Sequence, residues 1–227
     1  MPASASARQY EHAACAWFRR GAIQQVVREE LRQCAPELDR VGGRRGLLLA
    51  GCAGLPDALE GHRLHTLHAG HLDARGLAAP ARGAEARWPL CSASLGLVHL
   101  LHALELAGDP VGLLGECARV LEPEGVLVVL AFNPASPFRL RWLGRGIRGL
   151  GRVEVSRMVR AAGLDVIGCR RVGVWWRAGE PAVVERTGLL PPLRSSFVLV
   201  ARRREPGLTP LRLERRRVAI GAGAAPG

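Results

Sequence analysis

Two uninterrupted apolar runs, residues 95–101 and 126–132, flank an amphipathic stretch in the middle of the chain. Continuous apolar runs of this length are typical of strands that are buried on both faces of a parallel sheet. Between them, Asp109 can act as a helix N-cap, and Pro110 fits a first helical position. Pro123 cannot continue a helix, so the helix has to end before it. The pattern predicts a strand–helix–strand unit.

The expected helix has one apolar face and one polar face. Glu116 and Arg119 are three residues apart, a spacing at which opposite charges pair weakly on a helix. The apolar positions recur at three- and four-residue intervals, as expected for a face that packs on a sheet; they are Leu113, Leu114, Cys117, Val120 and Leu121.

The rest of the chain continues the alternation of strands and helices. Helices are expected within residues 7–38, where Pro36 ends the pattern, and at 153–162, which Gly163 closes. Further strands are expected at residues 46–50, 63–67, 83–87, 164–176 and 196–202. This order predicts an α/β fold, a Rossmann-like three-layer sandwich with a mostly parallel seven-stranded sheet.

Three regions follow from this pattern. Residues 1–40 form an N-terminal helical segment, and residues 41–204 form the α/β domain. Residues 205–227 are rich in Arg, Gly, Ala and Pro, and we expect a flexible tail there. A basic insertion with several glycines lies at residues 136–151.

The central unit carries a family resemblance. Glu116-x-x-Arg119-Val120-Leu121-x-Pro123-x-Gly125 resembles the E-x-x-R-V-L-x-P-G-G segment of class I methyltransferases, and of the type-11 methyltransferase domain in particular. HALE at 102–105 and FNP at 132–134 are similar to segments of a bacterial branch of that family. The resemblance extends from about residue 17 to about residue 212. It implies a methyltransferase that uses S-adenosylmethionine and whose methyl acceptor is unknown.

The resemblance also implies where the cofactor binds. Ligands of open parallel sheets lie beyond the carboxyl ends of the strands, near the point where the strand order reverses. Asp73 is expected to take the place of the acid that binds the ribose hydroxyls. The other implied cofactor-binding residues are Leu49, Gly51, Cys52 and Gly54 after the first strand, and Glu85, Ala86 and Arg87 in a loop like the one that contacts adenine.

Several positions depart from the family pattern. Leu49-Ala50 stand where an acid usually ends the first strand, Ala53 replaces a glycine, and Gly96 replaces an aspartate. Each lost charge-assisted hydrogen bond costs about 1.5–3 kcal/mol of binding. These departures support an alternative hypothesis, a catalytically silent relative that keeps the fold as a binding or scaffold module.

Three polar residues follow the central strands. His102 is the candidate catalytic residue, as a general base with an ordinary pKa near 6.5, although it could equally be a structural histidine. Glu105 is interpreted as a solvated or capping carboxylate. Asn133 could contact the substrate, or the Asn-Pro pair could simply mark a turn. Methyl transfer depends mainly on alignment of the reactants, so the reaction does not require an obvious catalytic group.

The formal net charge of +12 raises a second alternative, nucleic-acid binding. All 32 basic residues are arginine, and they are spread along the chain instead of forming one stripe. A localised basic face would be better support for this role. A nucleic-acid partner is therefore conceivable but not favoured, and the oligomeric state is open.

The histidines, the cysteines and the lengths of the apolar runs lead to three further expectations. His62, His65, His68 and His71 recur every three residues, but on a strand this spacing alternates between the two faces, so no metal site is expected. The six cysteines contain no C-x-x-C pair, which favours reduced cysteines and a cytoplasmic protein. No apolar run approaches the ~20 residues of a membrane-spanning helix, and no signal peptide is recognisable, so no membrane partner is expected.

Overall fold

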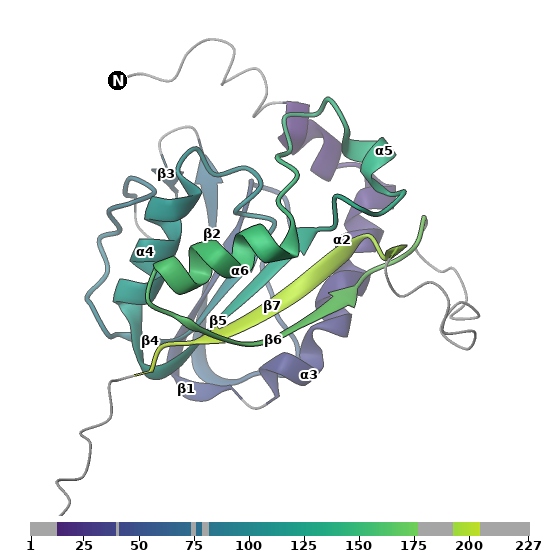
Figure 1. Ribbon diagram of the computed structural model, residues 1–227. Coiled ribbons are helices and arrows are strands. Elements are labelled where there is room, and N and C mark those ends of the chain that lie inside the picture. The colour runs from purple at the N-terminus through teal and green to yellow at the C-terminus, as the bar shows by residue number, and fades with distance from the viewer. Residues whose placement is uncertain (1–12, 40, 74–75, 79–81, 177–192, 205–227) are drawn as a thin grey trace, which may run out of the picture.

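The computed structural model describes residues 13–39, 41–73, 76–78, 82–176 and 193–204 (Figure 1). The predicted tail, residues 205–227, lies outside the described residues, and the division into three regions stays a prediction.

The strands form one seven-stranded sheet in the order β3-β2-β1-β4-β5-β7-β6. The four neighbours β2, β1, β4 and β5 are parallel, while β7 runs antiparallel to both β5 and β6, and β3 runs antiparallel to β2. The mostly parallel seven-stranded sheet is therefore confirmed. The strands are β1 (Gly42–Ala50), β2 (Arg63–Asp73), β3 (Gly76–Leu77), β4 (Leu95–Leu101), β5 (Leu121–Phe132), β6 (Asp165–Val172) and β7 (Ser196–Arg202).

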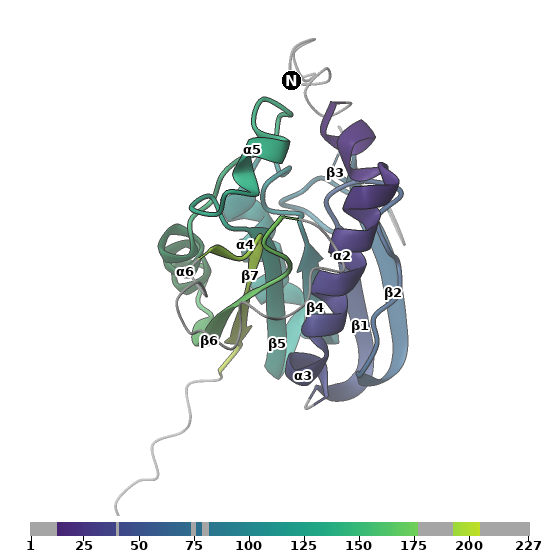
Figure 2. The same cartoon turned by 90° about the vertical axis from the view of Figure 1, so that its right-hand side faces the viewer.

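Helices cover both faces of the sheet, which confirms the three layers (Figures 1 and 2). Residues 13–18 are helical and pack with α2 (Gly21–Gln33), α3 (Ala35–Leu38) and α5 (Arg139–Trp142) on one face. The helices α4 (Pro110–Val120) and α6 (Arg152–Ala161) pack on the other face. Each face has its own apolar core because side chains alternate between the two faces along every strand.

The central unit folds as its pattern predicts. The Asp109 carboxylate accepts the backbone N–H of Gly112 at 2.9 Å, and α4 begins at Pro110. Glu116 and Arg119 pair at 2.7 Å. The helix ends at Val120, before Pro123. All the predicted apolar positions of this segment are buried.

Several sequence predictions are wrong in detail. The second strand extends to Asp73, and the third strand is Gly76–Leu77 instead of residues 83–87. Gly76 has φ +113, which glycine adopts without strain, and it pairs with Asp73 in the antiparallel contact of β3 with β2. Residues 83–87 make only isolated bridges. In addition, Pro36 lies in the first turn of the short helix α3.

Candidate functional site

The strand order of the sheet reverses between β1 and β4, and the chain segments that leave these two strands touch. The backbone N–H of Gly51 donates to the carbonyl of Leu101 at 2.9 Å. A Cβ atom at Gly51 would lie only 2.2 Å from the carbonyl oxygen of His102. Glycine is therefore needed here for the packing of the chain on itself.

Three charged side chains gather next to this contact, and we call Glu30, His102 and Glu105 the carboxylate–imidazole cluster. The Nε2 atom of His102 lies 3.0 Å from Oε2 of Glu30, and its Nδ1 atom lies 3.1 Å from Oε1 of Glu105. All three side chains are 0 % exposed. The cluster joins helix α2 to the carboxyl end of β4.

Neutral donors surround the two carboxylates. The hydroxyls of Ser195 and Ser196 donate to Oε1 of Glu30 at 2.6 and 2.5 Å. The backbone N–H of Phe132 donates to Oε1 of Glu105 at 2.6 Å. Among the described residues, Oε2 of Glu105 is buried without a hydrogen-bond partner. With both carboxylates ionised and the imidazole protonated, the cluster has a formal charge of −1.

The surroundings of His102 favour the imidazolium. Burial lowers the pKa of His102, but the charges and hydrogen bonds of Glu105 and Glu30 outweigh it and raise the pKa to about 9. The ring also stacks on Phe132 with 4.0 Å between centroids, a contact that favours a cation. His102 has φ +50, an uncommon conformation for a residue other than glycine.

The geometry of the cluster tests the sequence interpretations of Glu105 and His102. The expectation that Glu105 is a solvated carboxylate is wrong, because the residue is 2 % exposed and its carboxylate binds the backbone of β5. An imidazolium with both nitrogens engaged has no free lone pair, so the arrangement favours the structural interpretation of His102. A catalytic role for His102 remains a prediction.

Aromatic side chains cover the cluster. The ring of Phe18 lies 5.5 Å from His102 and 5.8 Å from Phe132. Trp17 contacts Phe132 at 5.7 Å. The side chain of Gln24 donates to the carbonyls of Phe18 and Gly54, both at 2.8 Å. The N-terminal helices are thereby tied to the turn that follows β1.

The predicted cofactor-binding residues around this turn differ in their exposure. Leu49 is fully buried in the core beneath α4, and Cys52 is 1 % exposed. Gly54 is exposed, has φ +90 and lies beside the side chain of Arg19.

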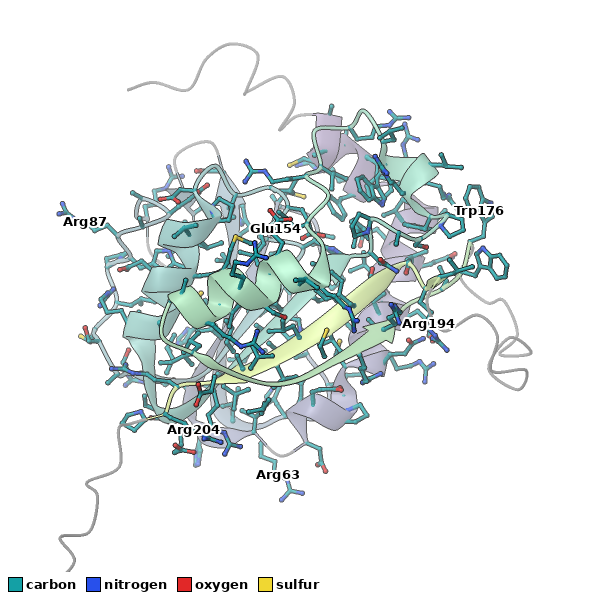
Figure 3. All side chains as sticks on the ribbon, in the orientation of Figure 1. Arg63, Arg87, Glu154, Trp176, Arg194 and Arg204 are labelled. Carbon is teal, nitrogen blue, oxygen red and sulfur yellow. The ribbon has the colours of Figure 1, made fainter. Side chains whose placement is uncertain are left out.

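The predicted ribose and adenine contacts lie on other segments. Asp73 is half-buried at the end of β2. The carboxylate of Glu85 accepts the backbone N–H groups of Gly108 and Asp109 at 3.0 and 2.6 Å. It therefore already binds the backbone directly before α4. Ala86 and Arg87 are exposed, and Arg87 projects from one edge of the molecule (Figure 3).

Asn133, the predicted substrate contact, is 8 % exposed. Its side-chain amide donates to the carbonyl of Arg194 at 3.1 Å, and its side-chain oxygen accepts the N–H of Ala135 at 3.1 Å. These bonds shape the turn after β5. The contact with a substrate stays a prediction.

Glu30, Ser195 and Ser196 were not among the residues predicted from the sequence. The signal for Glu30 is present in the sequence, because it follows Ile23 and Val26 at helical spacing and so lies on the apolar face of α2. A carboxylate on an apolar face requires buried partners. No comparable local pattern marks the two serines.

A groove lies away from the switch point. Its volume is about 450 Å³, and it is lined mainly by α3, β6 and β7, with Val126 at the amino end of β5. Within the described ranges, no cluster of three or more histidine, cysteine or acidic side chains could hold a metal ion. His65, His68 and His71 lie along β2. None of the helices in the described part of the chain is long and apolar enough to span a membrane.

Comparisons with known proteins identify the fold. No protein-family model matches the chain, and no curated protein matches its sequence. A Haloferax volcanii complex of the Trm112 methyltransferase activator with its proposed methyltransferase gives a TM-score of 0.58 at 14 % identity, over 88 % of this chain and 98 % of that chain. A SAM-dependent methyltransferase from Thermotoga maritima gives 0.54 at 12 % identity, over 87 % and 98 %. The [4+2]-cyclase SpnF gives 0.51 at 16 % identity, over 77 % and 79 %. The chain has the fold of these proteins.

Proposed function

We propose that the protein is a class I methyltransferase that transfers a methyl group from S-adenosylmethionine to an unknown acceptor. The observation that supports this most is the strand order, which puts the Gly51 turn, Asp73 and the carboxylate–imidazole cluster after the carboxyl ends of neighbouring strands. This is the end of an open sheet where ligands bind. The likeness to methyltransferase structures supports the same reaction, while fold alone does not establish activity.

The residues present fit both ends of S-adenosylmethionine, although they differ from those of the family pattern. The half-buried carboxylate of Asp73 would accept the hydrogens of the ribose hydroxyls. The exposed backbone at Gly54 would face the ligand. The Oε2 atom of Glu105 is buried and has no hydrogen-bond partner in the described part of the chain, so it would act on the cationic end through its charge and not by contact. The cofactor supplies an already activated methyl group, so these residues have to bind and align it.

A second candidate function is a catalytically silent binding module. The space in front of Gly51 is filled by the backbone of His102, and Phe18 covers the cluster. The fold of a [4+2]-cyclase is also similar, so this architecture serves functions other than methyl transfer. A silent module predicts a folded protein that does not bind S-adenosylmethionine.

Titration calorimetry with S-adenosylmethionine distinguishes the two functions. We expect micromolar binding to the wild-type protein and about tenfold to hundredfold weaker binding to Asp73→Asn, because a charge-assisted hydrogen bond is lost. Asp165→Asn is the matched control, since Asp165 begins the strand at the far edge of the sheet and is 58 % exposed. A folded wild-type protein that does not bind the cofactor would contradict the proposal.

A further inference from the structure

We propose that the carboxylate–imidazole cluster recognises the positive charge of the cofactor, and that the charge of Glu105 selects S-adenosylmethionine over its neutral product, S-adenosylhomocysteine. This inference rests on the proposed function. It assigns charge recognition to residues of α2 and of the segment after β4, because Leu49 and Ala50 stand where an acid usually ends the first strand in the resembling family.

The first support is position. His102 and Glu105 directly follow β4, the carbonyl of His102 contacts Gly51 after β1, and Phe132 at the end of β5 binds Glu105. The cluster therefore lies at the carboxyl ends of three neighbouring parallel strands, where the strand order reverses.

The second support is uncompensated charge. Two carboxylates share one imidazolium, and the two serine hydroxyls and the one backbone N–H that also donate to them are neutral. Oε2 of Glu105 is buried and has no hydrogen-bond partner in the described part of the chain. A buried charge without a partner is costly, so this arrangement favours a cation nearby.

The third support is the distribution of acids. The described chain buries three carboxylates, those of Glu30, Glu105 and Glu116. Glu116 lies on α4 and is neutralised by Arg119 at 2.7 Å. Leu49 and Ala50 end β1 without a charge. Glu30 and Glu105 are consequently the buried carboxylates at the ligand-binding end of the sheet.

The two ligands isolate the effect of charge. S-adenosylmethionine and S-adenosylhomocysteine differ by one methyl group and one positive charge. A buried carboxylate acts on a nearby cation through a medium that screens it far less than water does. Glu105 acts through this field and through His102, without touching the reacting atoms, and is a positioning residue.

The test is the ratio of the two dissociation constants in wild type and in Glu105→Gln, measured by calorimetry on the full chain. Glutamine keeps an oxygen that accepts the N–H of Phe132 and removes the charge. We expect binding of S-adenosylmethionine to weaken about tenfold, which corresponds to about 1.4 kcal/mol, while binding of S-adenosylhomocysteine changes less than about twofold. Glu154→Gln, an exposed carboxylate on α6, is the control and should leave the ratio unchanged.

If Glu105→Gln does not fold, the dissociation constants of three ligands for the wild-type protein provide a second test. Sinefungin carries an amine in place of the sulfonium, so it and S-adenosylmethionine should both bind at least as tightly as S-adenosylhomocysteine. Tighter binding of S-adenosylhomocysteine than of both cations, or an unchanged ratio in a folded Glu105→Gln, overturns this inference alone. A wild-type protein that binds none of the three ligands overturns the proposed function, and this inference with it.

Discussion

Gly51 is predicted from the sequence to contact the cofactor, but in the structure its lack of a side chain allows the chain to pack on itself. Its missing side chain makes room for the carbonyl of His102, which a Cβ would approach to 2.2 Å. We predict that Gly51→Ala lowers the free energy of unfolding by about 1–3 kcal/mol, the usual cost of overpacking. Gly115→Ala is the matched control, because nothing lies within 4 Å of that position on α4. It should stabilise the protein by about 0.5–1 kcal/mol. Equal effects in chemical denaturation would contradict this account.

Two buried histidines predict how stability depends on pH. His102 has its pKa raised to about 9 by Glu105 and Glu30 against burial, so its contribution is present below pH 6.5 and is lost as the pH rises through 9. His99 has its pKa lowered to about 3, first by burial and then by the charge of His102, so stability falls as the pH drops below 6.5. The free energy of unfolding should therefore be greatest near pH 6.5.

Denaturant titrations between pH 5 and 9 check this dependence. The loss between pH 6.5 and 9 should be roughly 3 kcal/mol, since each pKa unit corresponds to about 1.4 kcal/mol. Glu30→Gln removes one of the charges that hold the proton and should flatten this alkaline slope. A wild-type slope that is flat above pH 6.5 would show that His102 is not held as an imidazolium.

At the residue scale, the sequence predicts candidates better than it predicts their roles. His102 and Glu105 are both candidates from the sequence, yet the other nitrogen of His102 binds Glu30, which is 72 residues away in the chain. Such a contact is created by tertiary packing, and local spacing does not encode it. The helical position of Glu30 among apolar residues was the available clue.

At the element scale, the start of α4 offers a direct test. The carboxylate of Asp109 caps the helix through the N–H of Gly112. We predict that Asp109→Ala costs about 1 kcal/mol of stability, the typical value of an N-cap. Glu154→Ala changes an exposed carboxylate in the first turn of α6 that makes no cap, and it should change stability by less than about 0.5 kcal/mol. Thermal unfolding of both variants measures the difference.

The elements with strong local signals were the ones predicted correctly. The strand–helix–strand unit has a cap, a proline stop and two continuous apolar runs, and the structure confirms it. The third strand was misplaced because Gly76–Leu77 is two residues long and pairs with β2 only through Leu72 and Asp73. Too few residues are involved to produce a periodic pattern.

At the scale of the whole molecule, the arginines of the described residues do not all lie at one edge (Figure 3). Arg87 and Arg194 lie on opposite sides of the molecule, and Arg63 and Arg204 lie along its lower edge (Figure 3). Many arginines also pair with carboxylates, namely Arg32, Arg63, Arg119, Arg170, Arg202 and Arg204. We predict that an RNA or DNA oligomer binds no more tightly than the non-specific range of about 10⁻⁴–10⁻⁶ M at physiological salt. Nanomolar binding in fluorescence anisotropy at that salt concentration would favour the nucleic-acid alternative.

The central claim is that S-adenosylmethionine binds at the carboxyl ends of β1, β2 and β4. Hydrogen–deuterium exchange of the full chain, with and without saturating cofactor, tests both binding and location. We predict slower exchange in residues 51–54 and 102–107, with no change around the groove between α3 and β6. Unchanged exchange throughout, or protection confined to that groove, would contradict it.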